Sequence, residues 1–96
     1  MEVKITQTEQ GMATKLCLNL RHGLHSRPAA KLTQIAQQYT ADIQIVTKTE
    51  KADAKSILDI LSLSLQANAE VLLLAQGKDA YEALEHLSNF LGNIQD

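Results

Sequence analysis

The sequence is poor in aromatic residues, cysteine and proline, and it contains no tryptophan. Two tyrosines and one phenylalanine are too few to build the stacking platforms that bind single-stranded nucleic acid. The lone cysteine, Cys17, excludes an internal disulfide framework and fits a reducing compartment. A hydrophobic core must therefore be assembled from leucine, isoleucine, valine and alanine.

Strong charge and long apolar runs are also missing. A net charge of −2 gives no support for general binding to nucleic acid or to a bilayer surface. No apolar run approaches the ~20 residues of a membrane span, and residues 1–10 lack the apolar segment of a signal peptide. We therefore expect one cytoplasmic domain, with no nucleic-acid partner and no membrane insertion.

Hydrophobic periodicity alternates between strand and helix along the chain. Residues 14–21 alternate as in a strand, with Leu16, Leu18 and Leu20 inward and Cys17 outward. The same patterns predict further elements: a helix over 26–39, a strand over 42–47, a short strand or turn around 49–54, a short helix over 56–62, a strand over 70–75 and a helix over 79–91 that Gly92 ends.

The order β-α-β-β-α-β-α predicts an α+β fold. Strands that are apolar only at alternate positions have one covered face and one face in water. We therefore expect an open-faced β-sandwich, with a four-stranded, mainly antiparallel sheet and three helices packed on one face.

Residues 1–11 are mostly polar and end at a glycine, before the first strong strand signal. A flexible tail and an added edge strand through Val3 and Ile5 are both consistent with this composition. We assign residues 1–11 to an N-terminal extension and residues 12–96 to the domain.

The segment GLHSRPAA, residues 23–30, places a histidine at the start of a predicted helix. Ser26 is expected to cap that helix, and Pro28 fits its first turn. The unpaired N–H groups and the helix dipole favour an anion there, above all a phosphate. The same positive potential favours a neutral, nucleophilic His25 ring, and the planar charge of Arg27 suits a phosphoryl group. This pattern favours a histidine that accepts and returns a phosphoryl group.

Other interpretations of His25 compete with this one. A histidine near a helix start is often only a partly exposed polar residue. His22 and His25 are too few to predict a metal site, so we expect none. No serine or cysteine has an adjacent base at a recognisable spacing, which disfavours a nucleophilic hydrolase. The main rival is an interaction module in which His25 is inert and no phosphate is carried.

The segment GLHSRPAA resembles the active-site signature of the HPr family, Gly-[Leu/Ile]-His-[Ala/Thr/Ser]-Arg-Pro-Ala. These are the histidine-containing phosphocarriers of the bacterial phosphoenolpyruvate:sugar phosphotransferase system. The segments AKSILDILSLSL, residues 54–65, and AEVLLLAQGKDAYEALEHL, residues 69–87, resemble the family's second segment and its last strand and helix. The resemblance covers about residues 13–91 and implies an HPr-like fold.

The resemblance implies a role for each matching residue. His25 would carry the phosphoryl group on Nδ1, Arg27 would stabilise it, and Ser26 would help to cradle it. Ser56 matches the serine that a dedicated kinase phosphorylates in many family members, although a plain helix cap is the alternative. The surface that docks partners would include the following residues: Leu24, Lys31, Leu58 and Leu61.

The resemblance also implies partners, with some open questions. A monomer would take its phosphoryl group from enzyme I and pass it to EIIA-type acceptors, without a cofactor, and an HPr kinase/phosphorylase would act on Ser56.

The sequence departs from the family pattern at three positions. Asp59 and Ser64 stand where many members carry glycine, and His22 replaces a small polar residue. Asp59 leaves the choice of partner open, including a regulatory, nitrogen-type branch. Because His25 is present, the chain is not one of the related proteins that have lost the histidine and act only as regulators.

Overall fold

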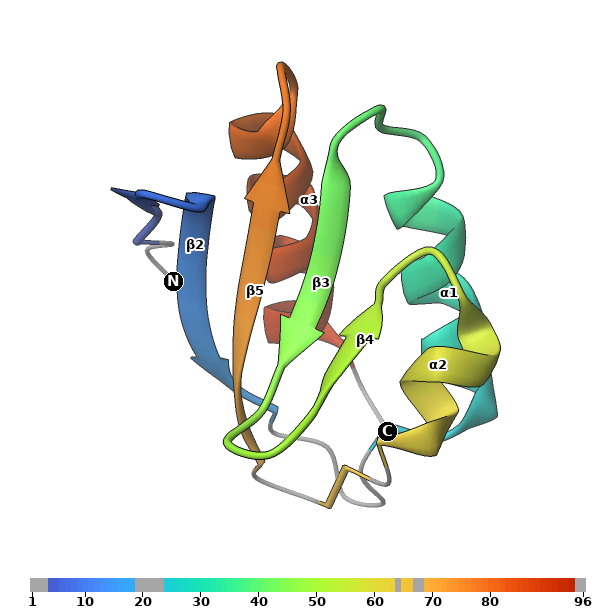
Figure 1. Cartoon of the computed structure of the whole chain (residues 1–96). Helices are drawn as coiled ribbons and strands as arrows, with labels where there is room; N and C mark the ends of the chain where they lie inside the picture. The colour runs from blue at the N-terminus through green and yellow to red at the C-terminus, as the bar shows by residue number, and fades with distance from the viewer. Residues whose placement is uncertain (1–3, 19–23, 64, 67–68, 95–96) are drawn as a thin grey trace.

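A computed structural model describes residues 4–18, 24–63, 65–66 and 69–94 (Figure 1). The elements follow in this order: β1 Thr6–Thr8, β2 Gly11–Cys17, α1 Ser26–Ala36, β3 Asp42–Val46, β4 Lys51–Asp53, α2 Ile57–Ser62, β5 Glu70–Gln76 and α3 Ala80–Asn93. Within these ranges no helix has both the length and the apolar character needed to cross a bilayer.

The strands form one antiparallel sheet of five strands in the order β1-β2-β5-β3-β4. In Figure 1 α3 lies behind the sheet, and α1 and α2 lie toward the β4 edge. The α+β class, the antiparallel pairing and the open-faced sandwich are therefore confirmed. The expected count of four strands is wrong, because residues of the N-terminal extension supply β1.

The hairpin of β1 and β2 explains the additional strand. Thr6 pairs with Ala13 and Thr8 with Gly11, and the Thr14 hydroxyl donates to the Lys4 carbonyl at 2.7 Å. Gly11 adopts a φ of 126°, and a Cβ at this position would meet the carbonyl of Ala75. The polar extension thus joins the sheet as an edge strand through residues 6–8, while Ile5 lies just before β1 and Val3 lies outside the described residues.

The core lies between one face of the sheet and the helices. Its largest fully buried side chains come from both layers: Leu18, Leu32, Ile43, Ile45, Ile60, Leu73, Leu84 and Leu87. The alternation predicted for the first strand holds, since Leu16 is half-buried on the core side and Cys17 is exposed. Leu20 lies outside the described residues. An aliphatic core of this kind stabilises the fold mainly through the hydrophobic effect.

Two helices end elsewhere than predicted. α1 stops at Ala36 rather than at 39, because the amides of Gln38 and Tyr39 bond three residues back instead of four, to Ile35 and Ala36. α3 continues through Gly92 to Asn93. The side-chain amide of Asn93 donates to the carbonyl of Asn89 at 2.7 Å, so the last turn is stabilised and Gly92 does not end the helix.

Asp79 links the α1–β3 connection to the start of α3. Its carboxylate oxygens accept the amide protons of Thr40 at 2.9 Å and Ala41 at 2.8 Å. These hydrogen bonds, chiefly the one from Thr40, lower the pKa of Asp79 below its ordinary value. The folded state therefore prefers the ionised carboxylate.

Replacing Asp79 should make stability less dependent on pH. A group with a depressed pKa stabilises the fold above its unfolded pKa, and this contribution is lost as the pH falls through the folded pKa. We expect Asp79→Asn to lower the thermal unfolding midpoint at pH 7. The difference from wild type should shrink at a pH well below 3.8, the usual pKa of an aspartate. Glu70→Gln, on an exposed position of β5, is the control; equal pH dependence in all three proteins would contradict the assignment.

Candidate functional site

His25 lies at the N-terminus of α1, where the sequence places it. It is the N-cap of the helix, with φ −99° and ψ −172°, and its carbonyl accepts the amide of Ala29 at 3.0 Å. Ser26 is the first residue inside the helix, so its predicted role as the cap is wrong. The reason is the extended backbone of His25, which brings its carbonyl, rather than that of Ser26, to the start of the helical hydrogen-bond series.

The first turn of α1 favours an anion next to His25. The amides of Ser26 and Arg27 precede the first helical hydrogen bond and have no acceptor within the helix. Pro28 is buried in this turn, where its missing N–H costs nothing. The turn contains no acidic residue, while Ser26 and Arg27 are exposed and His25 is half-buried. Gly23, expected to allow the sharp turn into the helix, lies outside the described residues, as do His22 and Ser64.

Ser56 caps α2, as predicted. Its hydroxyl accepts the amide of Asp59 at 3.3 Å. The start of α2 is also tied to the end of α1, because Lys55 donates its ammonium to the carbonyl of Tyr39 at 2.7 Å and its own carbonyl accepts the side-chain amide of Gln37 at 3.1 Å. The two helices are thereby held side by side.

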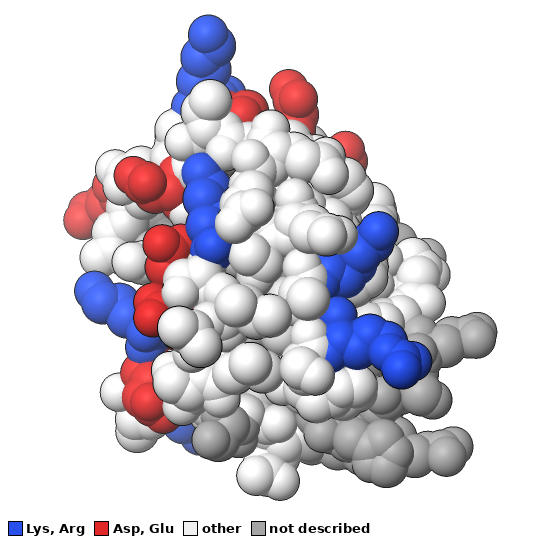
Figure 2. All heavy atoms as spheres, turned by 90° about the vertical axis from the view of Figure 1, so that its right-hand side faces the viewer, with Lys and Arg blue, Asp and Glu red and all other residues white. Residues whose placement is uncertain are grey.

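The residues expected to dock partners are not all on the surface. Leu58 is 77% exposed, Lys31 is exposed and Leu61 is half-buried. Leu24 is only 6% exposed and packs in the core, so its predicted place on a docking surface is wrong. Figure 2 shows the side of the molecule with α1 and α2, where a broad uncharged area is bordered by charged side chains.

Tyr39 and His86 form a contact that the sequence did not predict. The Tyr39 hydroxyl lies 2.7 Å from Nδ1 of His86, and the two rings meet edge to face at 5.8 Å. Burial raises the pKa of Tyr39, as do the negative charges of Glu82, Asp79 and Glu85. This contact joins the end of α1 to α3. The residues are 47 positions apart, and no local pattern predicts such a pair.

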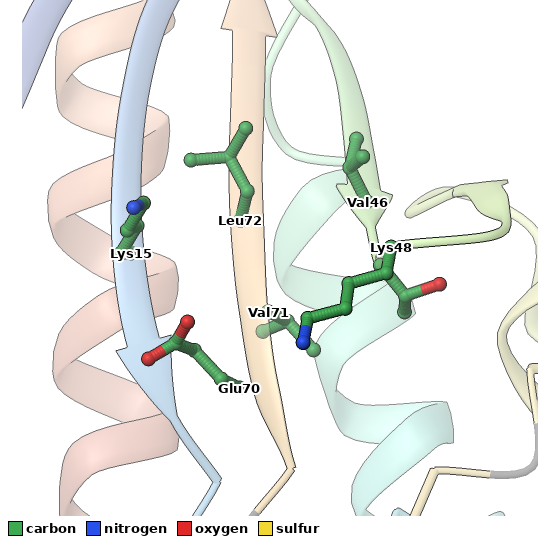
Figure 3. Close-up of a pocket in the computed structure, with 7 residues that line it drawn as sticks. Lys15, Val46, Lys48, Glu70, Val71 and Leu72 are labelled. Carbon is green, nitrogen blue, oxygen red and sulfur yellow. The ribbon is translucent and has the colours of Figure 1, made fainter.

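A hollow lies on the opposite, open face of the sheet (Figure 3). It is lined by residues of β2, β3, β5 and the turn after β3: Lys15, Val46, Thr47, Lys48, Glu70, Val71 and Leu72. None of the predicted site residues is among them. In the described part of the chain no group of three or more His, Cys, Asp or Glu residues is placed to hold a metal ion.

The different burial of two leucines can be tested by unfolding. Leu24→Ala should lower the free energy of unfolding by about 2–5 kcal/mol, because it removes buried methyl groups and leaves a cavity. Leu58→Ala should change it by no more than about 0.5 kcal/mol, because the side chain is in water. Urea denaturation of both variants measures the difference; equal losses would contradict this assignment of core and surface.

Comparison with known proteins identifies the family. Residues 12–93 match the family model described as the PTS HPr component phosphorylation site. The chain is 40% identical over 77 residues to the HPr-like protein Crh of Bacillus subtilis, covering 80% of this chain and 91% of the relative. It is 36% identical over 78 residues to the phosphocarrier protein HPr of Buchnera aphidicola, covering 81% and 92%.

A solved structure supports the same assignment. The crystal structure of HPr-C-His from Thermoanaerobacter tengcongensis superposes with a TM-score of 0.80 at 32% identity, over 83% of this chain and 90% of that one. The family model, residues 12–93, spans the chain from β2 to the end of α3 and includes His25, whereas β1 precedes it. The chain belongs to the HPr family of phosphocarrier proteins of the phosphotransferase system.

Proposed function

We propose that this chain accepts a phosphoryl group on His25 from phosphorylated enzyme I and passes it to a sugar-specific EIIA-type acceptor. The observation that carries the proposal is the position of His25 as the N-cap of α1. His25 therefore directly precedes two amides without helical acceptors and an exposed arginine, at the positive end of the helix dipole. A phosphoryl group on the ring would be stabilised by all three.

The transfer is a displacement between two imidazole rings. The lone pair of neutral His25, at Nδ1 by family resemblance, attacks the phosphorus of the donor's phosphohistidine. The new N–P bond forms as the donor's N–P bond breaks, and the departing ring keeps the electron pair of that bond. Each ring retains the proton on its other nitrogen, so no further base is required. The Arg27 guanidinium and the α1 amides stabilise the equatorial phosphoryl oxygens.

The surface beside His25 suits brief contacts with protein partners. Leu58 offers an exposed apolar side chain, while Leu61 is half-buried and Lys31 exposed. A small apolar contact with a charged border is typical of complexes that must dissociate after each transfer. We propose that the protein acts in the cytoplasm as a monomer that meets its donor and its acceptors in turn through this surface.

Two alternatives differ in their predictions. In a regulatory, nitrogen-type branch, His25 is still phosphorylated, but by a different donor protein. In an interaction module, His25 and Arg27 are dispensable and no phosphoryl group is carried. The exposed Arg27, two residues after His25, favours the carrier, because a phosphoryl group on the ring calls for a planar, permanently charged partner and an inert module does not.

Intact mass spectrometry tests the carrier function. With phosphoenolpyruvate and enzyme I from the same organism, we expect one added phosphoryl group that is lost in acid. His25→Ala should gain none, and Arg27→Ala should be charged roughly tenfold to a hundredfold more slowly, because a charge-assisted hydrogen bond to the phosphoryl group is lost. Charging by a paralogous donor alone would indicate the regulatory branch, and no charging by either would indicate the interaction module.

We also propose that an HPr kinase/phosphorylase phosphorylates Ser56. The hydroxyl lies at the start of α2, next to the exposed Leu58, so an added phosphate would change the charge of the docking surface. Incubation with the kinase and ATP should give an acid-stable phosphoryl group that is absent from Ser56→Ala. If Ser56→Ala is modified to the same extent as wild type, Ser56 is only a helix cap.

A further inference from the structure

The open face of the sheet carries an apolar strip. Ile45 and Leu73 are buried in the core, whereas Val46, Leu72 and Leu74 point to the opposite face and are half-buried there. Val46 pairs with Leu72 across β3 and β5, so the apolar side chains adjoin one another. In the described part of the chain the core and the helices lie on the other side of the sheet (Figure 1), and this strip has no second layer over it.

The strip combines a hollow with an apolar side chain outside it. Leu72 and Val46 line the hollow of about 290 Å³, and Lys15 and Lys48 lie at its sides (Figure 3). Leu74 is not part of this lining and lies two residues further along β5. These two features can serve both members of a symmetric pair, because each copy can place its Leu74 in the hollow of the other.

The charges along one side of the open face change sign from end to end. On β3, Asp42 stands at the start of the strand and Lys48 stands two residues past its end, and both are exposed. On β4, Lys51 lies toward the Lys48 end and Asp53 toward the Asp42 end. This side of the face is therefore basic at one end and acidic at the other.

A two-fold axis that crosses β5 between Leu72 and Leu74 brings unlike groups of two copies together. The register of β3 and β5 places Lys48 and Asp42 at equal distances on either side of this axis, so Lys48 of each copy faces Asp42 of the other. The charges of β4 match in the same way, and the strands lie over one another as in aligned β-sandwiches. An axis along β5 would instead set Glu70 against Glu70 of the second copy, so the charges favour the first arrangement.

We propose that the open face of the sheet binds a second copy of this chain through this two-fold axis, as a weak and reversible pair. Five strands about 4.8 Å apart, with about six steps of 3.4 Å along each, give a face of about 400 Å² per copy. A standard interface buries about 800 Å² per partner, so the pair forms at high concentration and exchanges with the monomer of the proposed function. The pairing does not depend on phosphoryl transfer.

Sedimentation equilibrium with exchanged charges tests the proposal. At low salt we expect wild type to form dimers with a Kd of about 0.1–1 mM. Asp42→Lys and Lys48→Asp should each weaken dimerisation at least about tenfold, because each variant sets like charges against each other at two contacts. An equimolar mixture of the two variants should associate about as tightly as wild type, since every such contact between them joins unlike charges. Recovery on mixing also shows that both variants are folded.

Two leucines provide a matched test of the apolar contact. Leu74→Ala removes the side chain that enters the hollow and should weaken dimerisation about tenfold. Leu58→Ala removes an exposed leucine from α2, outside the open face, and should leave dimerisation unchanged.

Three outcomes would overturn the inference. Wild type that stays monomeric at about 1 mM would leave the open face to a partner of another kind. Dimers that neither charge variant weakens would be held by other contacts. Charge variants that stay monomeric when mixed would contradict the two-fold arrangement.

Discussion

The packing of α1 and α3 on one apolar face of the sheet determines where everything else in the molecule lies. Ala29 and Leu32 of α1 and Leu84 and Leu87 of α3 have essentially no exposed surface. These side chains fix the position and direction of α1 relative to the sheet. Because the direction of the helix sets where its unpaired amides point, the core also decides where an anion is favoured. The site at His25 is thus a consequence of aliphatic packing several residues away.

Polar contacts then hold the ends of the helices. Asp79 binds the chain that leaves α1, and Lys55 binds the same region from the start of α2. Both contacts involve backbone groups of the connection that follows α1, which Asp79 joins to the start of α3 and Lys55 to the start of α2. The Lys55 contact keeps α1 and α2 adjacent, so that both helices lie on the side of the molecule that Figure 2 shows. A carrier needs such a surface, since its partners must reach the ring without entering a pocket.

Much of the fold could be predicted because its signals are local. Alternation at Leu16 and Leu18 marks a strand, and Pro28 can stand only near a helix start. The expectations for residues 6–8 and for the end of α3 were wrong because contacts with other parts of the fold outweigh the local signal. The polar residues 6–8 give no strand signal of their own, and they form β1 because the edge of β2 supplies hydrogen bonds. Gly92 has a weak helix propensity, but the packing of Leu91 and the bond from Asn93 carry the helix past it.

The sequence by itself determined where a phosphoryl site is predicted, because His25, Arg27 and Pro28 lie within four residues and a helix start can be recognised from neighbouring residues. It also determined the aliphatic core, through the spacing of its leucines and isoleucines. Only the tertiary structure decided that Leu24 is buried while Leu58 is exposed, and that Tyr39 meets His86. It alone showed the Asp59 carboxylate bound to the amide of Asp53. These are properties of how separate elements pack together. No local sequence pattern identifies two residues that are far apart along the chain and in contact in the fold.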